Sequence, residues 1–239
     1  PRGFTLRDIP DTDRRGTFIR EKKPKRALVA GAGYVGLELA ENLVHAGLDV
    51  TVAELSGHII APLDAEMAAA PQRYLREKGI KLLLQNGLTG VEPGTQGLTV
   101  SLTKTAVETD MLLLGIGVKP ESGLARDAGL RLNDRGAIIV DARMRTSAQD
   151  IYAVGDAVEV TNAVTGKRAH IPLAGPANRQ GRIAADSIMD IPRRYAGSQG
   201  TAIVELFGLT VGSTGINETA AKREGIDYDK IYLTPLSHV

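Results

Sequence analysis

The first apolar segments of the chain follow a strand, turn, helix, strand pattern. Residues 26–30 form a short, mainly apolar segment, and residues 31–36 are rich in glycine. Apolar residues then recur at the four-residue spacing of a helix, and a β-branched segment follows. The pattern predicts a strand at 26–30, a glycine-rich turn at 31–36, a helix at 35–46 and a second strand at 49–53.

Short apolar segments and helical stretches continue along the rest of the chain. Pro71 interrupts one helical stretch and predicts a kink or a late start. The pattern at 150–156 predicts an apolar strand that ends in Gly-Asp. A helix is predicted over 176–190, with Pro176 in its first turn. The other expected elements are a helix at 64–78, strands at 81–84, 88–92, 98–102, 110–116, 137–140, 202–207 and 209–213, a turn at 93–94 and a helix at 217–224.

Composition places the chain among ordinary globular proteins. Of its 239 residues, 43% are apolar and 24% are charged, and the length corresponds to one or two compact units. The net charge of +1, with both signs scattered, argues against binding to nucleic acid or to an anionic membrane surface. The apolar run at 111–118 is shorter than the roughly 20 residues of a membrane helix. We therefore expect neither a nucleic-acid nor a membrane partner.

Cysteine and histidine usage limits the possible chemistry. The absence of cysteine excludes disulfides, thiolate metal ligands and a cysteine nucleophile on this chain. The four histidines are scattered without ligand spacing, so we expect no metal site. His170, Arg179 and Asp156 do not form a hydrolytic triad, because no serine stands in a G-x-S-x-G motif. We interpret His170 as a structural residue.

The segment 31–36, GAGYVG, fits a G-x-G-x-x-G dinucleotide fingerprint in the right context, because it follows a predicted strand and opens a predicted helix. Gly31 would allow the tight turn, Gly33 the approach of a pyrophosphate to the backbone, and Gly36 close helix–strand packing. The helix N-terminus favours an anion there. The alternative is that these glycines serve only the turn.

Two carboxylates follow the fingerprint. Glu54 ends the second predicted strand, where an acidic side chain accepts hydrogen bonds from the adenine ribose. This favours NAD over NADP, because a 2′-phosphate would meet a carboxylate and residues 55–58 supply no guanidinium. The alternative for Glu54 is a strand-end residue facing solvent. Glu38 lies in the first helical turn, where the helix dipole alone also favours a carboxylate.

Four segments occur in the order seen in one family. They are GAGYVGLELAENL from Gly31, GIGVKPE from Gly115, TSAQDIYAVGDA from Thr146 and PLAGPANRQGRIAADSI from Pro172. With them the chain resembles the FAD-dependent pyridine nucleotide-disulfide oxidoreductases over essentially its whole length. ANRQGRIAAD and GTAIVELFGLTVGSTGINETAAKREGIDY are most similar to the branch with coenzyme A disulfide reductase, NADH oxidase and NADH peroxidase.

The resemblance implies an α/β fold in which a Rossmann-like NAD-binding domain, a βαβ unit with a β-meander, is inserted in a partial FAD-binding domain. The start of an α+β interface domain would follow. The implied boundaries are 1–22 for a connector from the FAD domain, 23–118 for the NAD-binding domain, 119–197 for the second half of the FAD-binding domain and 198–239 for the start of the dimerisation domain.

The resemblance also implies two sets of cofactor-binding residues. Asp156 would hydrogen-bond a ribityl or nearby hydroxyl of FAD, and the helix starting near Pro176 would direct its positive end toward the N1/O2 edge of the flavin. Glu38 and Gly117 would line the nicotinamide side. The expected NAD residues are Gly31, Gly33, Tyr34, Val35, Gly36, Glu38, Glu54 and Gly117, and the expected FAD residues are Gly155, Asp156, Pro172, Leu173 and Ala174.

The chain also departs from the family pattern. It has one G-x-G-x-x-G segment and no cysteine, whereas the family carries a first FAD fingerprint and a redox-active cysteine before the NAD domain. We therefore expect an interior piece of a longer enzyme, with no catalytic residue on this chain. The lack of a C-x-x-C pair between Gly36 and Gly117 argues against a thioredoxin-reductase arrangement.

The implied activity is transfer of a hydride from NAD(P)H to FAD and on to a disulfide such as coenzyme A disulfide. An NADH oxidase or peroxidase of the same fold is an alternative, so the acceptor is a disulfide, a peroxide or oxygen. A non-catalytic NADH-binding module is the alternative from another class. The chain starts at Pro1 without a secretory leader, so we expect a cytoplasmic enzyme, and the family implies a homodimer at full length.

Overall fold

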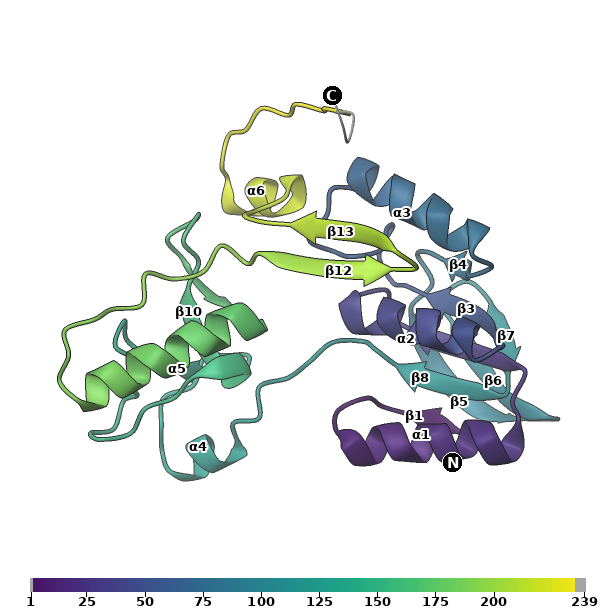
Figure 1. The fold of residues 1–239 in the computed structure, drawn as a ribbon, viewed down its shortest axis with the longest axis horizontal. Coiled ribbons are helices and arrows are strands. Elements are labelled where there is room, and N and C mark those ends of the chain that lie inside the picture. Colours follow the sequence, from purple (N-terminus) through teal and green to yellow (C-terminus); the bar gives the residue numbers. More distant parts are fainter. Residues whose placement is uncertain (1, 235–239) are drawn as a thin grey trace.

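The computed structural model describes residues 2–234 (Figure 1). Pro1 and residues 235–239, which belong to the expected connector and interface domain, lie outside the described residues. The helices are α1 (Ile9–Lys22), α2 (Tyr34–His45), α3 (Ala65–Glu77), α4 (Gly123–Asp127), α5 (Ala174–Ile188) and α6 (Glu218–Glu224), with a short 3₁₀ helix, η1 (Gly155–Ala157). The strands are β1 (Gly3–Phe4), β2 (Arg26–Ala30), β3 (Asp49–Ala53), β4 (Lys81–Leu83), β5 (Leu88–Gly94), β6 (Gly97–Leu102), β7 (Ala106–Thr109), β8 (Met111–Leu114), β9 (Ile138–Ile139), β10 (Val158–Thr161), β11 (Arg168–His170), β12 (Ala202–Leu206) and β13 (Leu209–Ser213).

A parallel sheet in the order β1-β8-β2-β3-β4 forms the centre of the first part of the chain. Successive residues of its strands face opposite sides, so Val29 packs in one apolar cluster with α2, while Leu28 packs in another with β6. The antiparallel β5-β6-β7 meander covers this second face (Figure 1). The predicted Rossmann-like βαβ unit with a β-meander is confirmed.

A second, smaller sheet, β11-β10-β9, packs with α5 around a separate cluster that includes Met144, Val160 and Ala184. The strand predicted over 150–156 is wrong. Only Tyr152 pairs there, in an isolated bridge to Arg145, and the chain then turns into η1. Residues 144–146 run antiparallel beside 151–153, with backbone hydrogen bonds from Thr146 N–H to the Ile151 carbonyl and from Ala153 N–H to the Met144 carbonyl, but this pairing is too short to form a regular strand.

The β12–β13 hairpin and α6 confirm the pattern predicted after residue 200. The hairpin turns at Phe207 and Gly208, both with positive φ, which suits a tight two-residue turn. Val204 and Leu206 are buried in the same cluster as Leu37 of α2. The hairpin therefore packs on the part of the chain that contains the parallel sheet, and it lies beside α2 (Figure 1).

The segment predicted as a connector from the FAD domain contains regular structure, and its assignment as a connector stays a prediction. It contains β1, which extends the parallel sheet, and α1, which Asp8 caps by accepting from the backbone N–H of Asp11. Phe4 stacks against Phe18, with ring centroids 5.1 Å apart, and both pack on the main cluster. Few apolar residues form this contact in a mostly polar segment, so the composition of the segment did not predict β1 or α1.

Smaller differences concern turns and proline. Helix α3 starts at Ala65 and includes Pro71, so the late start is not observed. The expected turn at 93–94 is the end of β5, and the chain reverses after Gly94. Strand β7 was not predicted. Among the helices of residues 2–234, none combines the length and apolarity that crossing a membrane requires.

Candidate functional site: a dinucleotide cavity and a flavin-side turn

A cavity of about 540 Å³ lies where β2, β3 and β8 end. Because these strands are parallel, their carboxyl ends meet at one edge of the sheet, where ligands bind in folds of this type. Residues from the loops after these strands form its wall, together with residues just before β5 and just after β6. They include Gly31, Gly33, Glu54, Ser56, His58, Gly87, Thr103 and Gly117.

Two of the three fingerprint glycines are required by packing within the chain. Gly31 has φ +101°, and a Cβ on it would lie 2.3 Å from the carbonyl oxygen of Gly115. A Cβ on Gly36 would lie 2.1 Å from the carbonyl oxygen of Gly31. The strand–turn–helix contact therefore closes only with glycine at these two positions.

Gly33 is different, because the chain itself leaves room for a larger residue. A Cβ there would meet no atom within 4 Å, and its φ of −78° suits any residue. Gly33 is also the N-cap of α2, and no side chain caps this helix end. An exposed, uncapped helix N-terminus offers N–H groups and a positive dipole end to an anion. The arrangement fits the diphosphate of a dinucleotide.

Glu54 braces the loop beside this helix end. Its Oε2 accepts a hydrogen bond from the backbone N–H of Ala32 at 2.7 Å, and its Oε1 accepts from Ser56 N–H at 2.8 Å. An ionised carboxylate has about four acceptor positions, so further acceptor capacity remains. The predicted contact to a ribose hydroxyl stays a prediction, and positioning of the glycine loop is an added role.

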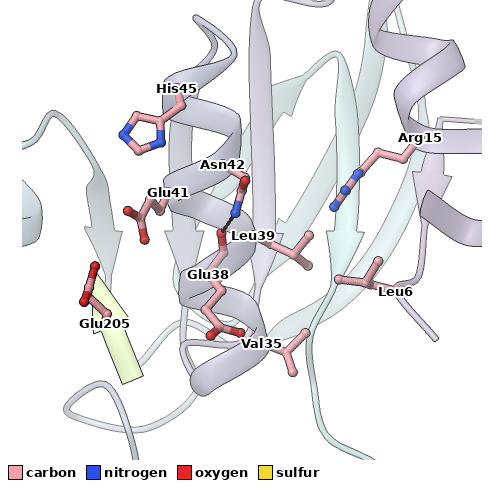
Figure 2. A pocket seen from close by; sticks show the side chains of 9 residues that line it. All are labelled: Leu6, Arg15, Val35, Glu38, Leu39, Glu41, Asn42, His45 and Glu205. Carbon is pink, nitrogen blue, oxygen red and sulfur yellow. Dashed lines mark hydrogen bonds between the residues drawn. The ribbon is translucent and has the colours of Figure 1, made fainter. Parts of the chain in front are cut away.

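Glu38 and Gly117, expected on the same side of the nicotinamide, line different cavities. Figure 2 shows Glu38 in a cavity of about 410 Å³ between α1, α2 and β12. Across it lies Arg15, whose guanidinium pKa is lowered by burial. The lining residues are Leu6, Arg15, Val35, Glu38, Leu39, Glu41, Asn42, His45 and Glu205.

Tyr34 and Val35 likewise do not line the cavity that contains Gly33. Val35 belongs to the cavity of Figure 2, and the hydroxyl of Tyr34 lies 3.3 Å from Oγ of Ser213 on β13. Of the residues expected to bind NAD, the structure gathers Gly31, Gly33, Glu54 and Gly117 around one cavity. Nucleotide contacts by Tyr34, Val35 and Glu38 remain predictions.

Two of the residues expected to bind FAD, Gly155 and Asp156, form a turn beside α5. Gly155 has φ +83°, and a Cβ there would meet no atom within 4 Å. The backbone N–H of Gly155 donates to Oε1 of Gln180 at 2.8 Å, and Nε2 of His170 donates to the carbonyl of Asp156 at 2.5 Å. The Asp156 side chain is exposed, which leaves its carboxylate accessible to a hydroxyl.

The segment 172–174 leads directly into α5, and its residues are partly or fully exposed. Leu173 is the N-cap, and no side chain caps the helix. The open turn, the accessible carboxylate and the uncapped helix end fit one side of a flavin. Flavin contacts by Pro172, Leu173 and Ala174 remain predictions.

Sequence reasoning missed Ser56 and Gln180. Ser56 acts through its backbone N–H, for which no side-chain signal exists. Gln180 left a signal, because it stands four residues before the apolar Ala184 on the inner face of a predicted helix. A polar residue on the buried face of a helix indicates a buried hydrogen bond.

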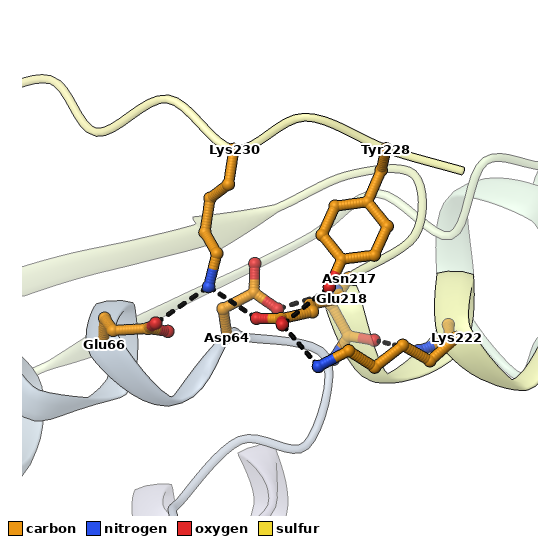
Figure 3. Close-up of polar contacts among 8 residues, drawn as sticks. Asp64, Glu66, Asn217, Glu218, Lys222, Tyr228 and Lys230 are labelled. Carbon is orange, nitrogen blue, oxygen red and sulfur yellow. Dashed lines mark hydrogen bonds and ion pairs between the residues drawn. The ribbon is translucent and has the colours of Figure 1, made fainter. Parts of the chain in front are cut away.

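A polar cluster joins α6 to the start of α3 (Figure 3). Asp64 accepts from the backbone N–H of Glu218 at 2.7 Å, and Lys230 bridges Glu218 and Glu66. Hydrogen bonds from Lys222 and Lys230 lower the pKa of Glu218 to about 2, and the hydrogen bond from Lys230 lowers that of Glu66 to about 2. The cluster holds α6 and the segment after it against the start of α3.

The fold and this cavity define an α/β nucleotide-binding protein of the Rossmann type. Residues 3–181 match the family described as pyridine nucleotide-disulphide oxidoreductase. That match covers more than half of the chain, and the chain belongs to this family. FAD and NADH or NADPH are the cofactors of the family and its solved members.

Three similar proteins illustrate the relationship. Coenzyme A disulfide reductase of Staphylococcus epidermidis is 33% identical over 237 residues, which are 98% of this chain and 53% of that protein. Reduced CoADR-RHD of Bacillus anthracis superposes with a TM-score of 0.92 at 44% identity, covering 96% of this chain and 41% of that one. Water-forming NADH oxidase of Lactobacillus brevis, bound to NADH, has a TM-score of 0.87 at 32% identity, covering 94% and 50%. The chain spans about half the length of the curated relatives it matches.

Proposed function

We propose that this chain supplies the NADH site and one side of the FAD site of a flavoprotein oxidoreductase that reduces a disulfide such as coenzyme A disulfide. One observation carries the proposal. Gly33 caps α2 beside an open cavity, although nothing in the described chain requires glycine there. A bound diphosphate supplies the missing reason, because only a residue without Cβ lets it reach the backbone N–H groups.

Each part of the chain has a role in this proposal. The N-terminus of α2 binds the diphosphate, and Glu54 holds the loop of Ala32 while facing the adenine ribose. Asp156 accepts from a flavin hydroxyl, and the N-terminus of α5 stabilises negative charge on the reduced ring. Bound FAD supplies the two-electron acceptor between the nicotinamide and the final substrate.

A disulfide is the preferred acceptor because the CoADR structure of Bacillus anthracis shares 44% identity with this chain. Oxygen is the second candidate, because the water-forming NADH oxidase shares a lower identity of 32%. Peroxide as acceptor, a homodimeric full-length enzyme, a cytoplasmic location and the lack of a nucleic-acid partner remain predictions. A non-catalytic NADH-binding module remains the alternative from another class.

The test is NADH titration of this chain and its Gly33→Ala variant by calorimetry. The added methyl meets no protein atom, so we expect unchanged thermal stability and a loss of NADH affinity of about tenfold or more, because it would enter the diphosphate position. The matched control is Gly181→Ala on α5, where a Cβ also meets no atom within 4 Å. Equal NADH affinity in all three proteins would refute the proposed site.

A further inference from the structure

The side chain of Gln180 is a buried polar group that the proposed function leaves unexplained. It is 1% exposed and lies on the inner face of α5 with Ala184 and Ser187. A buried amide costs free energy unless it is hydrogen-bonded, and an apolar residue would fill this stripe at lower cost. Its presence therefore needs a reason outside the packing of the helix.

The contact of Gln180 supplies that reason. Its Oε1 accepts from the backbone N–H of Gly155 at 2.8 Å, across 25 positions of sequence. Gly155 has φ +83°, and this left-handed backbone directs the chain into η1, where Asp156 follows. The hydrogen bond thus fixes the turn at the residue next to the exposed carboxylate.

A second hydrogen bond holds the other side of the same turn. Nε2 of His170 donates to the carbonyl oxygen of Asp156 at 2.5 Å. His170 and Gln180 lie on either side of the N-terminus of α5, on β11 and within α5 respectively. Together they tie the turn to the helix that is expected to face the flavin ring, so the carboxylate and the helix end keep one relative position.

We infer that Gln180 is a positioning residue for flavin: it fixes the Gly155–Asp156 turn so that the Asp156 carboxylate is preorganised for the hydroxyl of the cofactor. His170 acts with it on the Asp156 carbonyl. This inference rests on the proposed function, because the Asp156 carboxylate is expected to accept its hydrogen bond from a bound flavin. Preorganisation raises affinity by removing the cost of ordering the turn on binding.

The test uses the full-length protein that contains this chain, stripped of FAD and titrated with FAD. Gln180→Met keeps the length and volume of the side chain and removes the acceptor. We expect FAD affinity to fall about tenfold or more, with an altered visible spectrum of the bound flavin. Gln180→Glu, which retains an acceptor oxygen, should recover a large part of the affinity. Arg182→Met, an exposed position on the same helix, should match wild type.

Thermal stability of the apoprotein separates positioning from a structural role. A structural role predicts a lower melting temperature and normal FAD affinity of the folded protein, and this result would overturn the inference. If Gln180→Met does not fold, His170→Ala removes the donor on the other side of the turn, and normal FAD affinity there would also overturn it. A wild-type protein that binds no FAD would overturn the proposed function itself, whereas a normal Gln180→Met variant would overturn this inference alone.

Discussion

Replacement of Gly36 by alanine tests whether this glycine is required for packing within the chain, unlike Gly33. The new Cβ would lie 2.1 Å from the carbonyl oxygen of Gly31 and 3.1 Å from its carbonyl carbon. Real Cβ atoms do not approach backbone this closely, so α2 or the loop must move. Neither neighbour is a flexible side-chain end that could rotate away.

The magnitude follows from two opposing effects. Overpacking against backbone costs about 1–3 kcal/mol, occasionally more. Alanine in a helix gains up to about 1 kcal/mol over glycine. We expect a net loss of about 1–2 kcal/mol in the free energy of unfolding, and a melting temperature lower by about 2–8 °C for a chain of this size.

The assay is urea and thermal unfolding of wild type and Gly36→Ala, with Gly181→Ala as the matched control. The control lies inside α5 with open space around its Cβ, so it should keep or increase stability. A Gly36→Ala variant as stable as the control would refute the packing role and leave all three glycines with the same explanation.

Two further predictions concern carboxylates. Glu54→Ser removes the acceptors for the backbone N–H groups of Ala32 and Ser56 and the charge that would repel a 2′-phosphate. NADH binding should weaken, and the ratio of NADPH to NADH affinity should rise. An unchanged ratio in paired titrations would contradict the assignment of Glu54 to the adenine ribose. Burial raises the pKa of Asp110, but hydrogen bonds from Arg26 and the adjacent backbone outweigh it and lower the pKa to about 2. Its stabilisation is therefore complete above about pH 4 and is lost as the pH falls toward 2. Asp110→Asn should be less stable by about 1–2 kcal/mol at pH 7, and this difference should shrink between pH 4 and 2 in denaturation curves; a constant difference would count against the ion pair.

Local patterns predicted the centre of the fold well. Strand β2, the glycine turn and helix α2 carry their signals in adjacent residues, so the sequence pattern locates them within about one residue. Elements whose stability depends on distant partners were harder to predict. Strand β1 pairs with β8 across more than a hundred residues, and the segment 150–156 has only a short partner at residues 144–146.

The candidate site shows the same division. The positions of Gly31, Gly33 and Glu54 around one cavity follow from parallel strands that end together. The separation of Glu38 from Gly117 depends on the direction in which α2 presents its side chains, and the glycine motif alone does not fix this direction. The hydrogen bond from Gly155 to Gln180 depends on tertiary packing between segments that each look ordinary in sequence.

The most direct measurement for the central claim is a crystal structure of this chain with NADH. The account predicts the diphosphate within hydrogen-bond distance of the backbone N–H groups at the N-terminus of α2, above Gly33, with the adenine ribose beside Glu54. A dinucleotide bound at another place on the chain, or a diphosphate held away from this helix end, would contradict the account.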